Sequence, residues 1–100
     1  MNDITYAITL SEEARQDEIE TYLYYEILRP GLGEEFLDAL ENRYSALRKH
    51  PHSYSFIDKN KDIRDVKVKR FPYVIIYEIS GSDVYVYSVH NTHMFPFNKK

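Results

Sequence analysis

The chain has 100 residues and a net charge of −3, and 43% of its residues are hydrophobic, which suits one compact domain over residues 1–100 and leaves no room for a second. It has no cysteine, which excludes a disulfide framework and thiolate metal ligands. No apolar run approaches the ~20 residues that cross a bilayer, and no basic segment precedes one near the N-terminus. We therefore expect a soluble, cytoplasmic protein that does not engage a membrane.

The first third of the chain predicts a strand followed by a helix. Residues 4–9 alternate as a short strand does, and Ser11 is a good N-cap with acidic residues directly after it. The helix should begin at Glu12 and end near Leu28, because a Pro-Gly-Leu-Gly turn begins at Pro30. Its buried stripe is predicted to comprise Ala14, Ile19, Tyr22, Leu23 and Ile27.

A second helix is predicted from about Glu34 to His50, where Pro51 closes it because the residue before a proline resists the α region. Its apolar residues recur at helical spacing and should be buried: Phe36, Leu37, Leu40, Tyr44 and Leu47. The two helices should form an antiparallel hairpin. Residues 52–62 carry mixed signals and are interpreted as a loop.

The C-terminal half predicts three strands, at residues 63–70, 73–79 and 84–90, with a turn joining the last two. The element order is therefore β-α-α-β-β-β. We predict an α+β fold in which the helical hairpin packs on one face of a curved, mostly antiparallel four-stranded sheet, and the other face stays open.

Two of these strands differ in their side-chain pattern. In the first, Lys67 and Lys69 alternate with two valines, so one face of that strand should be wet. The next strand begins after Pro72 and is apolar on both faces, which places it inside the sheet.

Charge is unevenly distributed along the chain. Residues 1–48 hold eleven acids against four bases, whereas residues 49–100 hold nine bases against five acids. The cations gather between Lys59 and Arg70, where only Asp62 and Asp65 oppose Lys59, Lys61, Arg64, Lys67, Lys69 and Arg70. Such an excess would attract an anionic partner, but lysines also protect a solvated edge strand from aggregation, and charge alone does not choose between these readings.

Four ordered stretches carry a family resemblance that covers nearly the whole chain. They are Leu10 to Ala14 with Asp17, Pro30 to Gly33 with Phe36, Leu47 to Pro51, and Arg70 to Tyr77 with the final strand. Together they resemble the RelE/ParE superfamily of toxins from bacterial type II toxin–antitoxin systems. The resemblance implies a small α+β toxin held inactive by an antitoxin encoded beside it.

The C-terminus departs from the superfamily pattern. Members often end the last strand with His-x-Arg-Arg-x-Pro, and anchoring on Pro96 places Asn91 at the histidine and His93 and Met94 at the arginines. Both arginines are therefore missing. This loss and the acidic total count against a RelE-like, ribosome-dependent mRNA endonuclease. They favour a ParE-like inhibitor that acts by binding, for which the resemblance implies DNA gyrase as the target. A third possibility is a non-toxic module that only binds its antitoxin.

The candidate target-binding residues are Arg64, Lys67, Lys69, Arg70 and His90. If the protein is RelE-like, the candidate catalytic residues are His93, Arg70 and Lys69, since imidazole moves protons near neutral pH and cations steady phosphate charge. Histidines beside lysines are common without catalysis, so we favour a non-catalytic role for His90 and His93. We expect no metal or nucleotide cofactor, because a third metal ligand and a glycine-rich phosphate loop are both missing.

The sequence leaves open where some tyrosines lie and which oligomer the protein forms. Tyr24 and Tyr25 could contact a partner or pack internally, whereas Tyr85 and Tyr87 are expected to pack against the helices. The open sheet face and the helical hairpin should leave apolar surface for an extended or helical antitoxin segment. A homodimer and a toxin–antitoxin hetero-oligomer are both compatible with the sequence.

Overall fold

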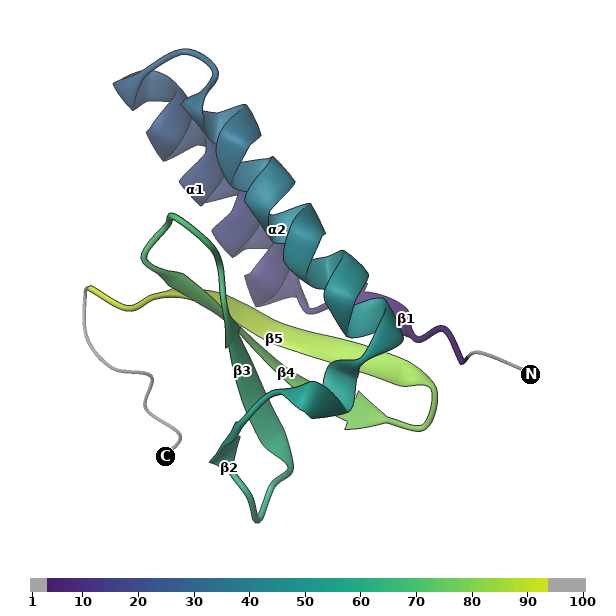
Figure 1. Cartoon of the computed structure of the whole chain (residues 1–100). Coiled ribbons are helices and arrows are strands. Elements are labelled where there is room, and N and C mark those ends of the chain that lie inside the picture. The colour runs from purple at the N-terminus through teal and green to yellow at the C-terminus, as the bar shows by residue number, and fades with distance from the viewer. Residues whose placement is uncertain (1–3, 94–100) are drawn as a thin grey trace.

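The computed structural model describes residues 4–93 and places a helical hairpin across one face of a mixed sheet (Figure 1). The helices are α1 (Glu12–Leu28) and α2 (Leu32–Lys49), followed by a short 3-10 turn at Pro51–Ser53. The strands are β1 (Ala7–Leu10), β2 (Phe56–Asp58), β3 (Ile63–Lys67), β4 (Tyr73–Ser80) and β5 (Asp83–Asn91). The α+β fold class and the order of its main elements are confirmed.

The sheet has five strands in the order β1-β5-β4-β3-β2, one more than predicted. The extra strand, β2, lies in the segment interpreted as a loop and pairs antiparallel with β3. It has only three residues, too few for an alternating pattern to be visible in the sequence. At the other edge, β1 pairs parallel with β5. The chain between them contains both helices and the other three strands, so it is long enough for the connection that a parallel pair requires.

Local contacts explain where the helices begin. Ser11 caps α1, since its Oγ accepts a hydrogen bond from the Ala14 N–H at 2.9 Å and donates one to the Tyr87 carbonyl at 2.7 Å. Between the helices, Gly31 has a φ of 92°, a conformation that favours glycine. At Gly33, an added Cβ would lie 2.7 Å from the Tyr22 carbonyl oxygen, so only glycine lets the helices approach this closely.

The core forms between α2 and the central strands. Phe36, Leu40 and Leu47 of α2 are 0 to 2% exposed, which confirms most of the predicted stripe of that helix, while Leu37 is partly buried. On β4, Ile75 is fully buried between β3 and β5, as expected for an interior strand. The remaining buried core residues are Ala14, Tyr44, Val66, Val68, Tyr73, Tyr77, Val84, Val86 and Val89.

The predicted buried stripe of α1 is wrong for Ile19, Leu23 and Ile27, although Ala14 is buried as predicted. Ile19, Leu23 and Ile27 are 55%, 51% and 84% exposed, whereas the buried positions are Ala14 and Thr21. At 3.6 residues per turn, Ile19 and Leu23 lie about 140° and 180° around the helix from Ala14, so they cannot share its face. The small residues turn toward the rest of the protein, and a second, apolar stripe faces outward.

The sheet face turned away from the helices also differs from expectation. Tyr85 and Tyr87 alternate with the buried valines Val84 and Val86, and therefore point to the face opposite the helices. The prediction that these tyrosines pack against the helices is wrong. Nor is this face wholly open, because Val74 and Ile76 are only 6% and 0% exposed.

A half-buried carboxylate joins the two helices and should make stability depend on pH. The Tyr44 hydroxyl donates to Glu18; burial raises the pKa of Glu18, and the Tyr44 hydrogen bond offsets part of that rise. The folded protein therefore binds the carboxyl proton of Glu18 more tightly than the unfolded chain does. The folding stability that this adds is present at low pH and is lost as the pH rises through the raised pKa of Glu18.

We expect Glu18→Gln to remove that loss, because glutamine can still accept the Tyr44 hydrogen bond without a charge. Relative to wild type, the melting temperature of the variant should be higher at about pH 7 than at about pH 4. This change should amount to a few degrees or less, because the carboxylate of Glu18 is partly solvated. Thermal melts followed by circular dichroism at both pH values give this difference. An equal difference at the two values would contradict the assigned pKa shift.

Candidate functional site

Exposed cations gather at the connection between β3 and β4, residues 67–72, which we call the cationic loop. Lys67, Lys69 and Arg70 are all exposed. The Val68 N–H donates to the Tyr73 carbonyl at 2.9 Å and closes the connection into a tight turn. Arg70 has a φ of 73°, a left-handed conformation that is uncommon for a residue with a side chain. Because β3 ends at Lys67, the loop holds Lys69 and Arg70, which the sequence had placed in the strand.

Aromatic side chains anchor the cationic loop to the helices. The ring centroid of Phe71 lies 5.0 Å from that of Tyr25 and 5.4 Å from that of Phe36. Tyr73 also contacts Phe36, at 5.4 Å. Tyr25 is therefore part of the packing, while Tyr24, its neighbour in the chain, is 56% exposed. The aromatic residues hold the loop from inside, and its cations remain in solvent.

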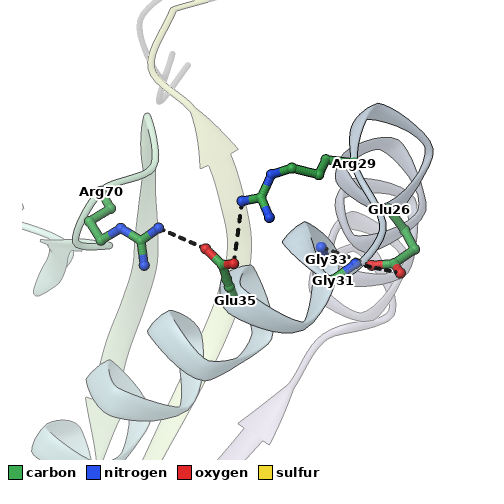
Figure 2. Close-up of polar contacts among 6 residues, drawn as sticks. All are labelled: Glu26, Arg29, Gly31, Gly33, Glu35 and Arg70. Atoms are coloured by element: carbon green, nitrogen blue, oxygen red, sulfur yellow. Dashed lines mark hydrogen bonds and ion pairs between the residues drawn. The ribbon is translucent and has the colours of Figure 1, made fainter.

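An ionic cluster connects the cationic loop to the hairpin. Glu35 accepts hydrogen bonds from Arg70 at 2.8 Å and from Arg29 at 3.3 Å, and Figure 2 shows the two guanidinium groups reaching it from opposite sides. The Arg70 contact, followed by that of Arg29, lowers the pKa of Glu35 below its ordinary value. One carboxylate between two guanidiniums leaves the cluster positive.

The end of β5 adjoins the cationic loop. The Thr92 N–H donates to the Pro72 carbonyl at 2.8 Å, which places the exposed His93 directly after a segment bound to the loop. His90 is half-buried within β5 and pairs with Val74 of β4. The structure thus brings the candidate catalytic residues Lys69, Arg70 and His93 into adjoining segments. Met94 and Pro96, used to align the C-terminal motif, lie outside the described residues.

Arg64 does not join the other cations. It is only 9% exposed, and its Nη1 donates to the carbonyls of His52 at 3.2 Å and Tyr54 at 2.6 Å. Its guanidinium also lies 3.9 Å from the ring centroid of Phe56. Period-two alternation puts position 64 on the same strand face as the buried Val66, and that signal was available in the sequence. Arg64 therefore stabilises the β2 edge of the sheet.

A second surface feature is an apolar groove beside α1, which sequence reasoning missed because it assigned these side chains to the core. The groove has a volume of about 380 Å³ and is lined by Leu10, Arg15, Glu18, Ile19, Tyr22, Leu23 and Leu37. Ile27, which is 84% exposed, continues the outward stripe of α1 beyond the groove. Apolar surface of this extent beside charged residues is typical of a protein interaction site.

On the opposite sheet face, Tyr87 donates a hydrogen bond to Glu78, which raises the pKa of Tyr87 to about 12. Its ring also contacts that of Tyr85, with 5.0 Å between centroids.

Within residues 4–93 no three His, Cys, Asp or Glu side chains are grouped so that they could hold a metal ion. Neither α1 nor α2, the helices of the described segment, is long and apolar enough to span a membrane.

Comparison with known proteins agrees with this architecture. A solved chain described as belonging to a chromosomal ParDE TA system from P. aeruginosa superposes with a TM-score of 0.74 at 12% sequence identity, covering 87% of this chain and 96% of that one. The two proteins therefore share one fold. The profile of the family described as ParE toxin of type II toxin-antitoxin system, parDE, matches residues 8–94. The chain belongs to this ParE toxin family. The search of curated proteins gives no match.

Proposed function

We propose that this toxin acts in the cytoplasm by binding DNA gyrase and blocking its activity, and that an antitoxin encoded beside it neutralises it. The observation that carries the proposal is the match to the ParE toxin family across residues 8–94. The arginine pair expected at the end of β5 for an mRNA-cleaving member is missing from the sequence, which also favours a binding mode of action.

The cationic loop is the surface we assign to gyrase. Lys67, Lys69 and Arg70 are exposed, and the aromatic contacts of Phe71 fix the backbone that carries them. Clustered charges on a fixed backbone raise the rate of association with an oppositely charged surface and set its orientation. His90, near the end of β5, and His93, just after this strand, extend the proposed contact, whereas buried Arg64 is left out of it.

Expression of the chain without its antitoxin tests the mode of action. We expect plasmid supercoiling to fall before protein synthesis does, because gyrase is the first process affected. An early arrest of protein synthesis with cleaved mRNA would instead indicate a RelE-like enzyme. Unimpaired growth would indicate a module that only binds its antitoxin.

The apolar groove beside α1 is the site we assign to the antitoxin. Its lining combines apolar side chains, Ile19 and Leu23, with two charged ones, Arg15 and Glu18. An amphipathic helix that places its apolar face in such a groove and its polar residues at the rim matches this composition. The exposure of Ile27 extends the surface toward the end of α1. We therefore expect a helical antitoxin segment to cover this stripe.

Leu23→Asp tests the antitoxin site. Since Leu23 is 51% exposed in the free protein, the variant should fold normally, but its carboxylate would be buried without a partner in the complex. We expect affinity for the antitoxin to fall about tenfold or more, measured by isothermal titration calorimetry. The control is Ser45→Asp, which adds the same charge at an exposed position of α2 outside the groove. Equal affinities for wild type and Leu23→Asp would place the antitoxin elsewhere.

A further inference from the structure

We propose that Glu35 is a positioning residue for target binding: it holds the Arg70 side chain and, through it, the cationic loop in one orientation against α2. This inference rests on the proposed function, since it takes Arg70 to be a contact residue for gyrase. The proposal gives Glu35 a role in target binding although Glu35 does not itself contact the target.

The contact between Glu35 and Arg70 joins parts of the chain 35 residues apart. Arg70 Nη2 lies 2.8 Å from Glu35 Oε1, and the guanidinium carbon lies 5.6 Å from the ring centroid of Phe71. The side chain of Arg70 is nevertheless 66% exposed, so much of it is available to a partner. Arg70 is thus oriented on one side and accessible on the other.

The backbone at Arg70 needs support from outside the loop. Its φ of 73° lies in the region that side-chain-bearing residues rarely adopt. Such conformations persist where the surroundings over-determine them, and they concentrate at functional sites. The ion pair with Glu35 holds the side chain of Arg70 itself, and the packing of Phe71 against Phe36 holds the next residue of the loop.

Contacts within the helical hairpin hold Glu35 in place independently of the cationic loop. It lies in the first turn of α2, where a negative charge is favoured by the helix dipole, and its N–H donates to the Gly31 carbonyl at 3.1 Å. The Glu26 carboxylate accepts from the N–H groups of Gly31 at 2.9 Å and Gly33 at 3.0 Å and so secures this turn (Figure 2). Arg29 binds the second oxygen of Glu35. The hairpin therefore presents a preset carboxylate to Arg70.

A contribution to stability does not explain this arrangement. Exposed ion pairs add little to folding free energy because water and salt screen them. Orientation of a binding group is a different effect, since a side chain held in place loses less conformational freedom when the partner arrives. The role assigned to Glu35 therefore predicts a change in binding with almost no change in melting temperature.

A double-mutant cycle in a gyrase supercoiling assay tests the inference. We expect Glu35→Gln to raise the protein concentration that half-inhibits gyrase about twofold to fivefold, the range expected for one exposed ion pair. In an Arg70→Gln background the same change should add nothing, because Glu35 acts through Arg70. The control is Glu41→Gln, which breaks the 2.8 Å ion pair with Arg48 elsewhere on α2. Additive losses, or an equal loss from Glu41→Gln, would overturn the role.

A measurement on the free protein separates this inference from the proposed function. Nitrogen-15 relaxation of the Arg70 Nε and of the amides of residues 69–71 should show greater mobility in Glu35→Gln than in wild type or Glu41→Gln. Unchanged mobility would refute the positioning role even where gyrase is inhibited. Increased mobility in a protein that leaves gyrase unaffected would refute the proposed target while the positioning of the loop by Glu35 stands.

Discussion

Ile75→Asp should unfold the protein. Ile75 is fully buried in β4, between Val66 of β3 and Val89 of β5, and no charged partner faces it across either pairing. Placing a carboxylate there costs several kcal/mol, a large part of the roughly 5–15 kcal/mol that stabilises a typical domain. Far-UV circular dichroism and a thermal melt read the outcome.

Lys67→Ala is the matched control for this prediction, because it changes an exposed residue of the neighbouring strand. Its melting temperature should stay within a few degrees of wild type, as is usual for surface substitutions. A cooperative melt of Ile75→Asp close to that of wild type would show that β4 is not the interior strand of the sheet.

Removing the charge of the cationic loop should abolish growth inhibition. The variant combines Lys67→Ala, Lys69→Ala and Arg70→Gly, and glycine is chosen because it adopts the φ of 73° at that position without strain. All three side chains are exposed, so the fold and antitoxin binding should be retained. We expect gyrase inhibition to weaken at least tenfold, as loss of several interfacial charges slows association and reduces affinity.

The control for the loop variant removes three cations elsewhere: Lys49, Lys59 and Lys61 changed to alanine. These residues are exposed at the end of α2 and in the turn between β2 and β3. Growth inhibition by this control should match that of wild type if position, and not total charge, determines activity. Full toxicity of the loop variant would mean that the gyrase contact lies on another surface.

Much of the fold follows from local signals in the sequence. Ser11 and Pro30 bracket a helix that runs from Glu12 to Leu28 in the structure, as predicted. The apolar spacing of α2 and the two-sided apolar pattern of β4 also identified a helix face and an interior strand correctly. These features are predictable because capping, periodicity and burial act on neighbouring residues.

The errors arose where tertiary context decides. The exposed stripe of α1 has helical spacing, but periodicity does not reveal whether an apolar face meets the chain's own sheet or a partner. Arg64 was grouped with Lys67 by charge, although the two residues point to opposite sides of β3. The link between Glu35 and Arg70 joins distant segments through long flexible side chains, which no local pattern encodes.

The most direct test of the account is a supercoiling assay with purified DNA gyrase, relaxed plasmid and the purified chain. We predict a concentration-dependent block of supercoiling, relieved by the antitoxin and much weaker for the loop variant. Full supercoiling in the presence of a large molar excess of the folded wild-type protein would contradict the proposal that this ParE family member acts on gyrase.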